Sequence, residues 1–167
     1  MTAVASLLEE LLEEAIATRR VLERVPGDKL AWRPHAKSMT LGQLALHMAT
    51  IPGNVANLAQ LDGFDTSQAN FEPPSPHDVQ ELAAALEQSL QTAESLLAKM
   101  SDQSAAANWR LTMRGVEVFS KPRIAILRSL MMNHWYHHRG QLSVYLRLLD
   151  VAVPVIYGRS ADENPFT

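Results

Sequence analysis

The 167-residue chain contains no cysteine. This absence excludes disulfide bonds, iron–sulfur clusters, cysteine-ligated zinc and a cysteine nucleophile. Any metal ion must therefore bind through nitrogen or oxygen ligands. A thiolate nucleophile, if the chemistry uses one, must arrive with a second substrate.

The chain also lacks an excess of positive charge and a long apolar run. Its 15 Lys and Arg residues against 18 Asp and Glu residues give a net charge of −3 and a pI near 6.0. Nucleic acid is not expected as a partner, because no strong positive field exists to hold a phosphate backbone. No segment reaches the roughly 18 to 20 apolar residues of a membrane span, and glutamates at the start replace the basic region of a secretory signal. We therefore expect no membrane association and a cytoplasmic protein.

Enough apolar material is present for one core. Hydrophobic residues make up 47% and charged residues 20% of the chain, which is typical of a folded globular protein. A domain usually takes about 100 to 200 residues. We therefore predict a single domain over residues 1–167.

Hydrophobic spacing predicts four long helices. Apolar residues recur every three or four positions over residues 2–25, and Pro26-Gly27 stops that helix. Thr40 and Gln43 form a capping box at the start of the second helix, which Pro52-Gly53 should kink or break. Similar spacing predicts helices over residues 76–100 and 122–149.

The remaining segments predict little regular structure. Residues 62–76 are rich in Gly, Pro, Ser and Asn and indicate a long crossover connection. Alternation on both sides of Arg114-Gly115 is compatible with a short hairpin, although two short strands alone are marginal. Residues 151–167 suggest an irregular tail that folds back over the helices. The predicted fold class is therefore all-α, a four-helix bundle with a long crossover connection and essentially no sheet.

The last predicted helix carries apolar residues on two faces. Its inward seam is predicted to consist of Ile124, Leu127, Met131, His134, His138, Gln141, Tyr145 and Leu148. Apolar residues outside that seam include Ile126, Leu130 and Val144. An exposed apolar strip usually marks a contact surface, so we expect a homodimer.

The spacing of the histidines is the most specific chemical pattern in the sequence. His134 and His138 are one helical turn apart and leave the same face of a helix, so they can chelate one ion. His47 lies in the apolar stripe of the second helix and can supply a third nitrogen if the two helices pack together. The competing interpretation is that these are hydrogen-bonded core histidines. His137 is the alternative ligand, but it points toward the flank of the helix.

The two other histidines and five further side chains have simpler interpretations. His35 and His77 are expected to face solvent. Arg139 can bind an anionic substrate or form a salt bridge with a neighbouring helix. Gln141 can contact a ligand histidine or a metal-bound water, or form an ordinary structural hydrogen bond. Three aromatic residues can line a pocket or serve as packing, namely Trp32, Trp135 and Tyr157.

Several separated motifs, in the expected order, resemble one protein family. The chain carries WRP at residues 32–34, MTLGQLALH at 39–47, NHWYHHRGQLSVYLRLL at 133–149 and VPVIYG at 153–158. It resembles the DinB family of damage-inducible bacterial proteins, which is distinct from the polymerase of the same name. The resemblance implies a four-helix bundle, usually dimeric, that binds a divalent ion, most often zinc or nickel. It implies that His47, His134 and His138 are the ligands.

Missing motifs restrict the possible mechanism. Trp135 replaces the glutamate of an H-E-x-x-H metalloprotease, and no nucleophile elbow or nucleotide-binding glycine loop is present. A metal ion would then act on a bound water or on the thiol of a low-molecular-weight substrate. The resemblance implies a metal-dependent enzyme of stress response or detoxification, of thiol S-transferase or hydrolase type. The alternative is a non-catalytic metal-binding or interaction protein.

Overall fold

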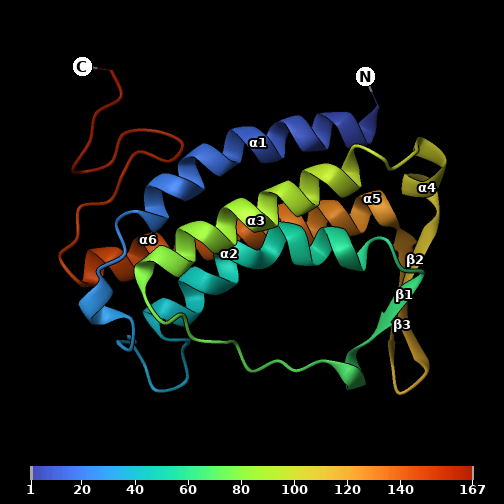
Figure 1. Cartoon of the computed structure of the whole chain (residues 1–167), viewed down its shortest axis with the longest axis horizontal. Coiled ribbons are helices and arrows are strands. Elements are labelled where there is room, and N and C mark those ends of the chain that lie inside the picture. Colours follow the sequence, from blue (N-terminus) through green and yellow to red (C-terminus); the bar gives the residue numbers. More distant parts are fainter. Residues whose placement is uncertain (1, 167) are drawn as a thin grey trace.

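A computed structural model describes residues 2–166, and four long helical segments dominate it (Figure 1). These are α1 (Ala3–Leu22), α2 (Leu41–Leu58), α3 (Val79–Leu97) and a final segment that ends in α6 (His134–Leu148). Both α3 and α6 pack against α1 and α2, which closes a four-helix bundle around one core. Among the described residues, no helix is both long and apolar enough to cross a membrane.

Side-chain caps define where three of the long helices begin. The Thr2 hydroxyl accepts a hydrogen bond from the Ala5 amide at the start of α1, and the Asp78 carboxylate accepts one from the Glu81 amide at the start of α3. The predicted capping box of Thr40 and Gln43 is present at the start of α2. Helices α1 and α3 are a few residues shorter than predicted. Val25 and Met100, the last apolar residues of the two predicted helices, lie just beyond the helix ends.

A small sheet corrects the expectation of an all-α protein. Strands β1 (Gly63–Asp65), β2 (Asn108–Met113) and β3 (Val116–Pro122) pair in the order β1-β2-β3. The pair β2-β3 is the antiparallel hairpin at Arg114-Gly115, and β1 runs parallel to β2. Because β1 has three residues inside the predicted irregular connection, it is too short to produce a recognisable alternation. This third strand supports a hairpin that would be marginal alone.

The hairpin turn is held by a side chain from β1. Arg114 and Gly115 both have positive φ angles, of 51° and 78°, as the tightest two-residue hairpin turns require. The Asp65 carboxylate accepts hydrogen bonds from the Arg114 amide at 3.0 Å and the Gly115 amide at 2.7 Å. The hydrogen bond from the Ser67 hydroxyl, together with these backbone bonds, holds the pKa of Asp65 well below its usual range. The remaining short elements are η1 (Gly27–Lys29), η2 (Thr66–Gln68) and α4 (Asp102–Ala106).

Helix α2 continues through Pro52 instead of breaking there. Proline has no amide hydrogen, so the carbonyl of Met48, four residues earlier, lacks its usual partner within the helix. The indole nitrogen of Trp135 on α6 donates a hydrogen bond to that carbonyl at 2.9 Å. The next amide, that of Gly53, donates to the hydroxyl of Ser89 on α3 at 2.8 Å. Neighbouring helices therefore satisfy the groups around the proline.

The last helical segment is not one uniform α-helix. It consists of α5 (Arg123–Ile126), the π-helical segment η3 (Leu127–Asn133) and α6. A π-helical turn contains more residues than an α-helical one, so the faces before and after η3 are not aligned. The buried face of α6 consists of Trp135, His138, Arg139, Leu142 and Leu146.

This change of register makes part of the predicted seam wrong. Gln141 is exposed and Leu148 is 58% exposed, although both were predicted to face inward. Ile126 was predicted to lie outside the seam, but it is only 1% exposed. A uniform helical period cannot anticipate the extra residue in a π-helical turn.

The C-terminal segment folds back over α1 and α6, as predicted (Figure 1). Beyond α6 the described residues form no further helix or strand. The Glu163 carboxylate bonds to Arg20 at 2.5 Å and to Arg24 at 2.8 Å, and Asp162 pairs with Arg147. Charged contacts therefore hold this segment in place.

Candidate metal centre

Three histidines from two helices meet at one point in the bundle. His47 comes from α2, and His134 and His138 come from α6. One nitrogen of each ring lies within 4.8 Å of the others. The Nε2 atoms of His134 and His138 are 2.6 Å apart, and the His47 ring centre lies 4.7 Å from that of His138. The structure thus brings together the three residues predicted to share an ion.

The hydrogen bond between Trp135 and Met48 aligns the two helices at this point. Trp135 directly follows His134, and Met48 directly follows His47. Trp135 and Met48 are both buried, so their bond is shielded from water. It therefore fixes the relative position of two of the three histidines.

Replacing Trp135 by phenylalanine is expected to destabilise the fold by at least about 1–3 kcal/mol, because the buried Met48 carbonyl loses its partner. Replacing Pro52 by alanine restores an amide that can bond to that carbonyl. In the Pro52→Ala background, Trp135→Phe should therefore cost less. Urea unfolding followed by circular dichroism on the four proteins of the double-mutant cycle measures this coupling.

Trp109 provides the matched control for this cycle. Its indole also donates a hydrogen bond to a carbonyl of α2, that of Leu58, at 3.0 Å. This carbonyl lies at the end of the helix, and Pro52 does not remove its hydrogen-bond partner. Trp109→Phe should therefore show no coupling to Pro52→Ala. Equal coupling for both tryptophans would contradict the assigned role of the proline.

Two of the histidines have defined partners for their second nitrogen. The Nδ1 atom of His138 lies 2.7 Å from the Oε1 atom of Gln141, so it donates its hydrogen to the amide oxygen. This arrangement leaves the lone pair on Nε2, facing the cluster. His134 hydrogen-bonds to the backbone of Leu130 in η3. Such bonds orient imidazoles that bind metals. Gln141 contacts one of the candidate ligand histidines, which was one of the roles predicted for it.

Burial keeps the three imidazoles neutral. It lowers the pKa of His47 and of His134, and it lowers the pKa of His138 to about 4. The neighbouring histidines add to this effect by disfavouring a second positive charge. Neutral imidazoles have a free lone pair, which metal binding requires. The donor set therefore fits a divalent transition-metal ion.

The other histidines lie outside the cluster. His137 is exposed, and its ring centre is 5.0 Å from that of His138, but its nitrogens do not join the converging set. His35 and His77 are exposed, as expected. The side chain of His137 therefore does not belong to the candidate metal site, although His134 and His138 in the same motif do.

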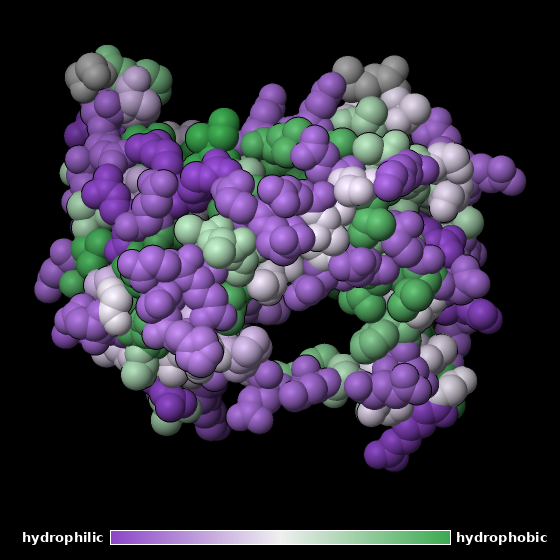
Figure 2. Space-filling model, in the orientation of Figure 1, coloured by the Kyte–Doolittle hydropathy of each residue, from purple (hydrophilic) through white to green (hydrophobic). Residues whose placement is uncertain are grey.

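A cavity of about 810 Å³ opens beside the histidine cluster, and His47 and His134 are in its wall. Figure 2 shows the molecule hollowed between the bundle and the crossover segment along its lower edge. The crossover is tied to the start of α2, since the Gln43 side-chain amide donates to the Pro73 carbonyl at 3.0 Å. The residues that line the cavity are Met39, Leu46, His47, Thr50, Asn54, Asn70, Phe71, Glu72, Pro73, Pro74, Glu81, Ala85 and His134.

The crossover contribution to this cavity was not predicted. Phe71 and Glu72 lie in an irregular segment with no periodicity, and Glu81 lies on a different helix from every histidine. No local pattern connects these residues to the histidine motifs. Only the path of the chain across the bundle brings them together.

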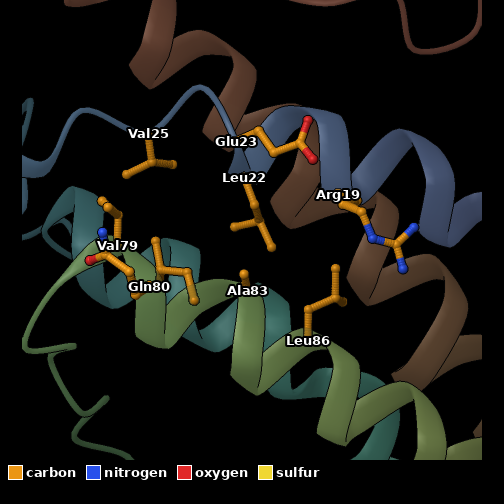
Figure 3. Close-up of a pocket in the computed structure, with 9 residues that line it drawn as sticks. Arg19, Leu22, Glu23, Val25, Val79, Gln80, Ala83 and Leu86 are labelled. Atoms are coloured by element: carbon orange, nitrogen blue, oxygen red, sulfur yellow. The ribbon is translucent and has the colours of Figure 1, made fainter.

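A second cavity, between α1 and α3, lacks comparable chemistry (Figure 3). Its volume is about 300 Å³, and its walls are mostly aliphatic, including Leu22, Val25 and Leu86. Arg19 and Glu23 contribute the charged groups, and no histidine is among the lining residues. Of these two cavities, only the histidine cavity therefore has candidate metal ligands in its wall.

Arg139 forms a salt bridge, which was one of the two roles predicted for it. It is buried and pairs with the carboxylate of Glu14 on α1. It also donates to the Glu14 carbonyl at 3.0 Å and to the Thr18 hydroxyl at 3.2 Å. Arg139 does not line the histidine cavity. Its role is to connect α6 to α1.

The three aromatic residues also serve as packing, since none lines the histidine cavity. Trp135 is buried in the core, and Trp32 packs edge-to-face on Tyr145 with ring centres 5.7 Å apart. Tyr157 is exposed, and its hydroxyl bonds to Glu14 at 3.0 Å. It lies against the guanidinium of Arg139 and so helps to anchor the C-terminal segment.

Comparison with known proteins identifies relatives along nearly the whole chain. The model of the DinB family matches residues 1–164. The uncharacterized protein YrdA of Bacillus subtilis (strain 168) is 28% identical over 152 residues, which cover 90% of this chain and 85% of that protein.

Solved structures of similar proteins share the fold. A DinB-like protein from Bacillus cereus ATCC 10987 superimposes with a TM-score of 0.67 at 24% identity, covering 90% of this chain and 95% of the other. The DinB-like protein YjoA from Bacillus subtilis gives a TM-score of 0.69 at 20% identity, covering 92% and 99%. At this identity the likeness concerns the fold alone.

Proposed function

The chain belongs to the DinB family, and on this premise we propose that it binds a divalent metal ion through His47, His134 and His138. We further propose that the bound ion serves a reaction of a small molecule. Zinc and nickel are the proposed metals, because both bind imidazole readily.

The observation that carries this proposal is the position of the three nitrogens beside a large cavity. A closed structural zinc site has four protein ligands, whereas a catalytic site has three and leaves a position open. Within the described residues, the cluster contains three histidines and no fourth ligand. His47 and His134 also line the cavity, which supports access for a substrate.

The proposed reaction is attack by a low-molecular-weight thiol, or by water, on a small electrophile. A divalent ion in the site would lower the pKa of a coordinated thiol or water. The chain itself supplies three neutral imidazoles, Gln141 to orient His138, and a cavity for the second reactant. We propose that such a reaction serves detoxification or a stress response.

A panel of bacterial thiols and electrophiles tests the reaction. The zinc- or nickel-loaded protein should consume a chlorodinitroarene or an epoxide with a thiol faster than the metal-free protein or the His138→Ala variant. Metal-dependent turnover in a hydrolase panel alone would assign water as the nucleophile. No turnover in either panel, with the metal bound, would favour a non-catalytic metal-binding protein.

We also propose that the protein is a homodimer. Val144 and Leu148 lie one turn apart on α6 and are 57% and 58% exposed, which suits an apolar contact with a second copy. Light scattering at micromolar concentration should give twice the 18.5 kDa of one chain, and Val144→Glu should reduce it to one chain. A monomer in the unmodified protein would contradict the proposal.

A further inference from the structure

The cavity beside the three histidines carries charge of one sign. Glu72 from the crossover and Glu81 from α3 line it, and no lysine or arginine is among the described residues that do. Phe71, next to Glu72, also lines the cavity and is 77% exposed. The wall formed by these three residues is called the acidic wall below.

Local hydrogen bonds hold the acidic wall in place. One carboxylate oxygen of Glu81 accepts a hydrogen bond from the His77 amide at 2.7 Å. The Glu72 amide donates to the Asn70 side chain at 2.9 Å. The following residue, Pro73, accepts the hydrogen bond from Gln43 that fastens the crossover to α2. The carboxylates therefore belong to anchored segments of the cavity.

The walls of the cavity provide two different environments for one ligand. The histidines offer a place for a metal-binding group, and the acidic wall attracts a positive charge. The exposed face of an aromatic ring such as Phe71 also attracts cations. Met39, Leu46 and Ala85 supply apolar surface within the same cavity. An anionic group at the acidic wall would be repelled.

We propose that this cavity selects a small molecule with a cationic amine, which lies at the acidic wall while a thiol or similar donor lies at the histidines. This inference rests on the proposed function, since it requires a metal ion at His47, His134 and His138. Its substrate class is therefore an aminothiol or a comparable amine-bearing ligand, in preference to an anionic thiol.

Three thiols of similar size test this selection by calorimetric binding to the zinc-loaded protein at low salt. They are cysteamine, which is cationic, 2-mercaptoethanol, which is neutral, and 3-mercaptopropionate, which is anionic. Each thiol is compared with itself in the unmodified protein and in the Glu72→Gln/Glu81→Gln variant, so that differences in thiol acidity cancel. Glu94→Gln, elsewhere on α3 and outside the cavity, is the matched control.

Loss of the two carboxylates should weaken cysteamine binding by about tenfold or more, given the strength of short-range charge attraction. Binding of 2-mercaptoethanol should not change, and binding of 3-mercaptopropionate should tighten. Glu94→Gln should leave all three affinities unchanged. If the double variant unfolds, the Glu72→Gln variant answers the same question, because the Glu81 carboxylate that accepts a hydrogen bond from the His77 amide remains.

The outcomes separate this inference from the proposed function. If zinc binds and the double variant changes all three affinities equally, or none, the charge selection is wrong and the metal site stands. If zinc binds but no thiol binds, the proposed substrate class is also wrong. If metal analysis finds no zinc at the histidines, both the proposed function and this inference are overturned.

Discussion

Replacing His138 by alanine is expected to remove bound zinc or nickel almost completely, from about one ion per chain to near none. The two remaining imidazoles retain too few ligands to hold an ion tightly. His47→Ala and His134→Ala should have the same effect. Metal analysis by mass spectrometry, on protein purified without a histidine tag and dialysed against metal, measures this loss directly.

His137→Ala is the matched control, since His137 is adjacent in sequence but lies outside the converging set. It should retain the metal of the unmodified protein. Metal should also raise the melting temperature of the unmodified protein and of His137→Ala, because an ion at 100 times its dissociation constant adds about 2.7 kcal/mol. Loss of metal from His137→Ala equal to that from His138→Ala would show that the ligand assignment is wrong.

Replacing Arg139 by methionine is expected to lower the free energy of unfolding by about 3–5 kcal/mol, the usual cost of removing one partner of a buried ion pair. Arg139 is 1% exposed, and its loss leaves the Glu14 carboxylate without its cation in a mostly buried site. The Thr18 hydroxyl and the Tyr157 hydroxyl lose a partner at the same time. Urea unfolding followed by circular dichroism measures the change.

Arg128→Met is the matched control for this prediction. Arg128 also joins the last helical segment to α1, through two hydrogen bonds of 2.6 and 2.7 Å to Glu10, but the pair is accessible to solvent. Such exposed pairs contribute about 0–1 kcal/mol. Equal losses in the two variants would show that burial does not decide the contribution of Arg139.

Local patterns in the sequence were enough to predict the helical bundle and to place His134 and His138 on one helix face. Regular apolar spacing revealed α1, α2 and α3, because one buried face of a helix repeats with the helical period. The capping box at Thr40 and Gln43 revealed the start of α2 through local chemistry alone. The four-residue separation of His134 and His138 placed both rings on one face of α6. These features all depend on interactions between residues close in the chain.

Tertiary structure alone decided the features that join distant segments. The three residues of β1 become a strand only because β2 lies beside them. The interruption expected at Pro52 is avoided because Trp135, on another helix, satisfies the Met48 carbonyl. The acidic wall of the histidine cavity exists because the crossover lines the same cavity as α2 and α3. Contacts between remote residues produce no local period, so their physical effect becomes visible only in the folded chain.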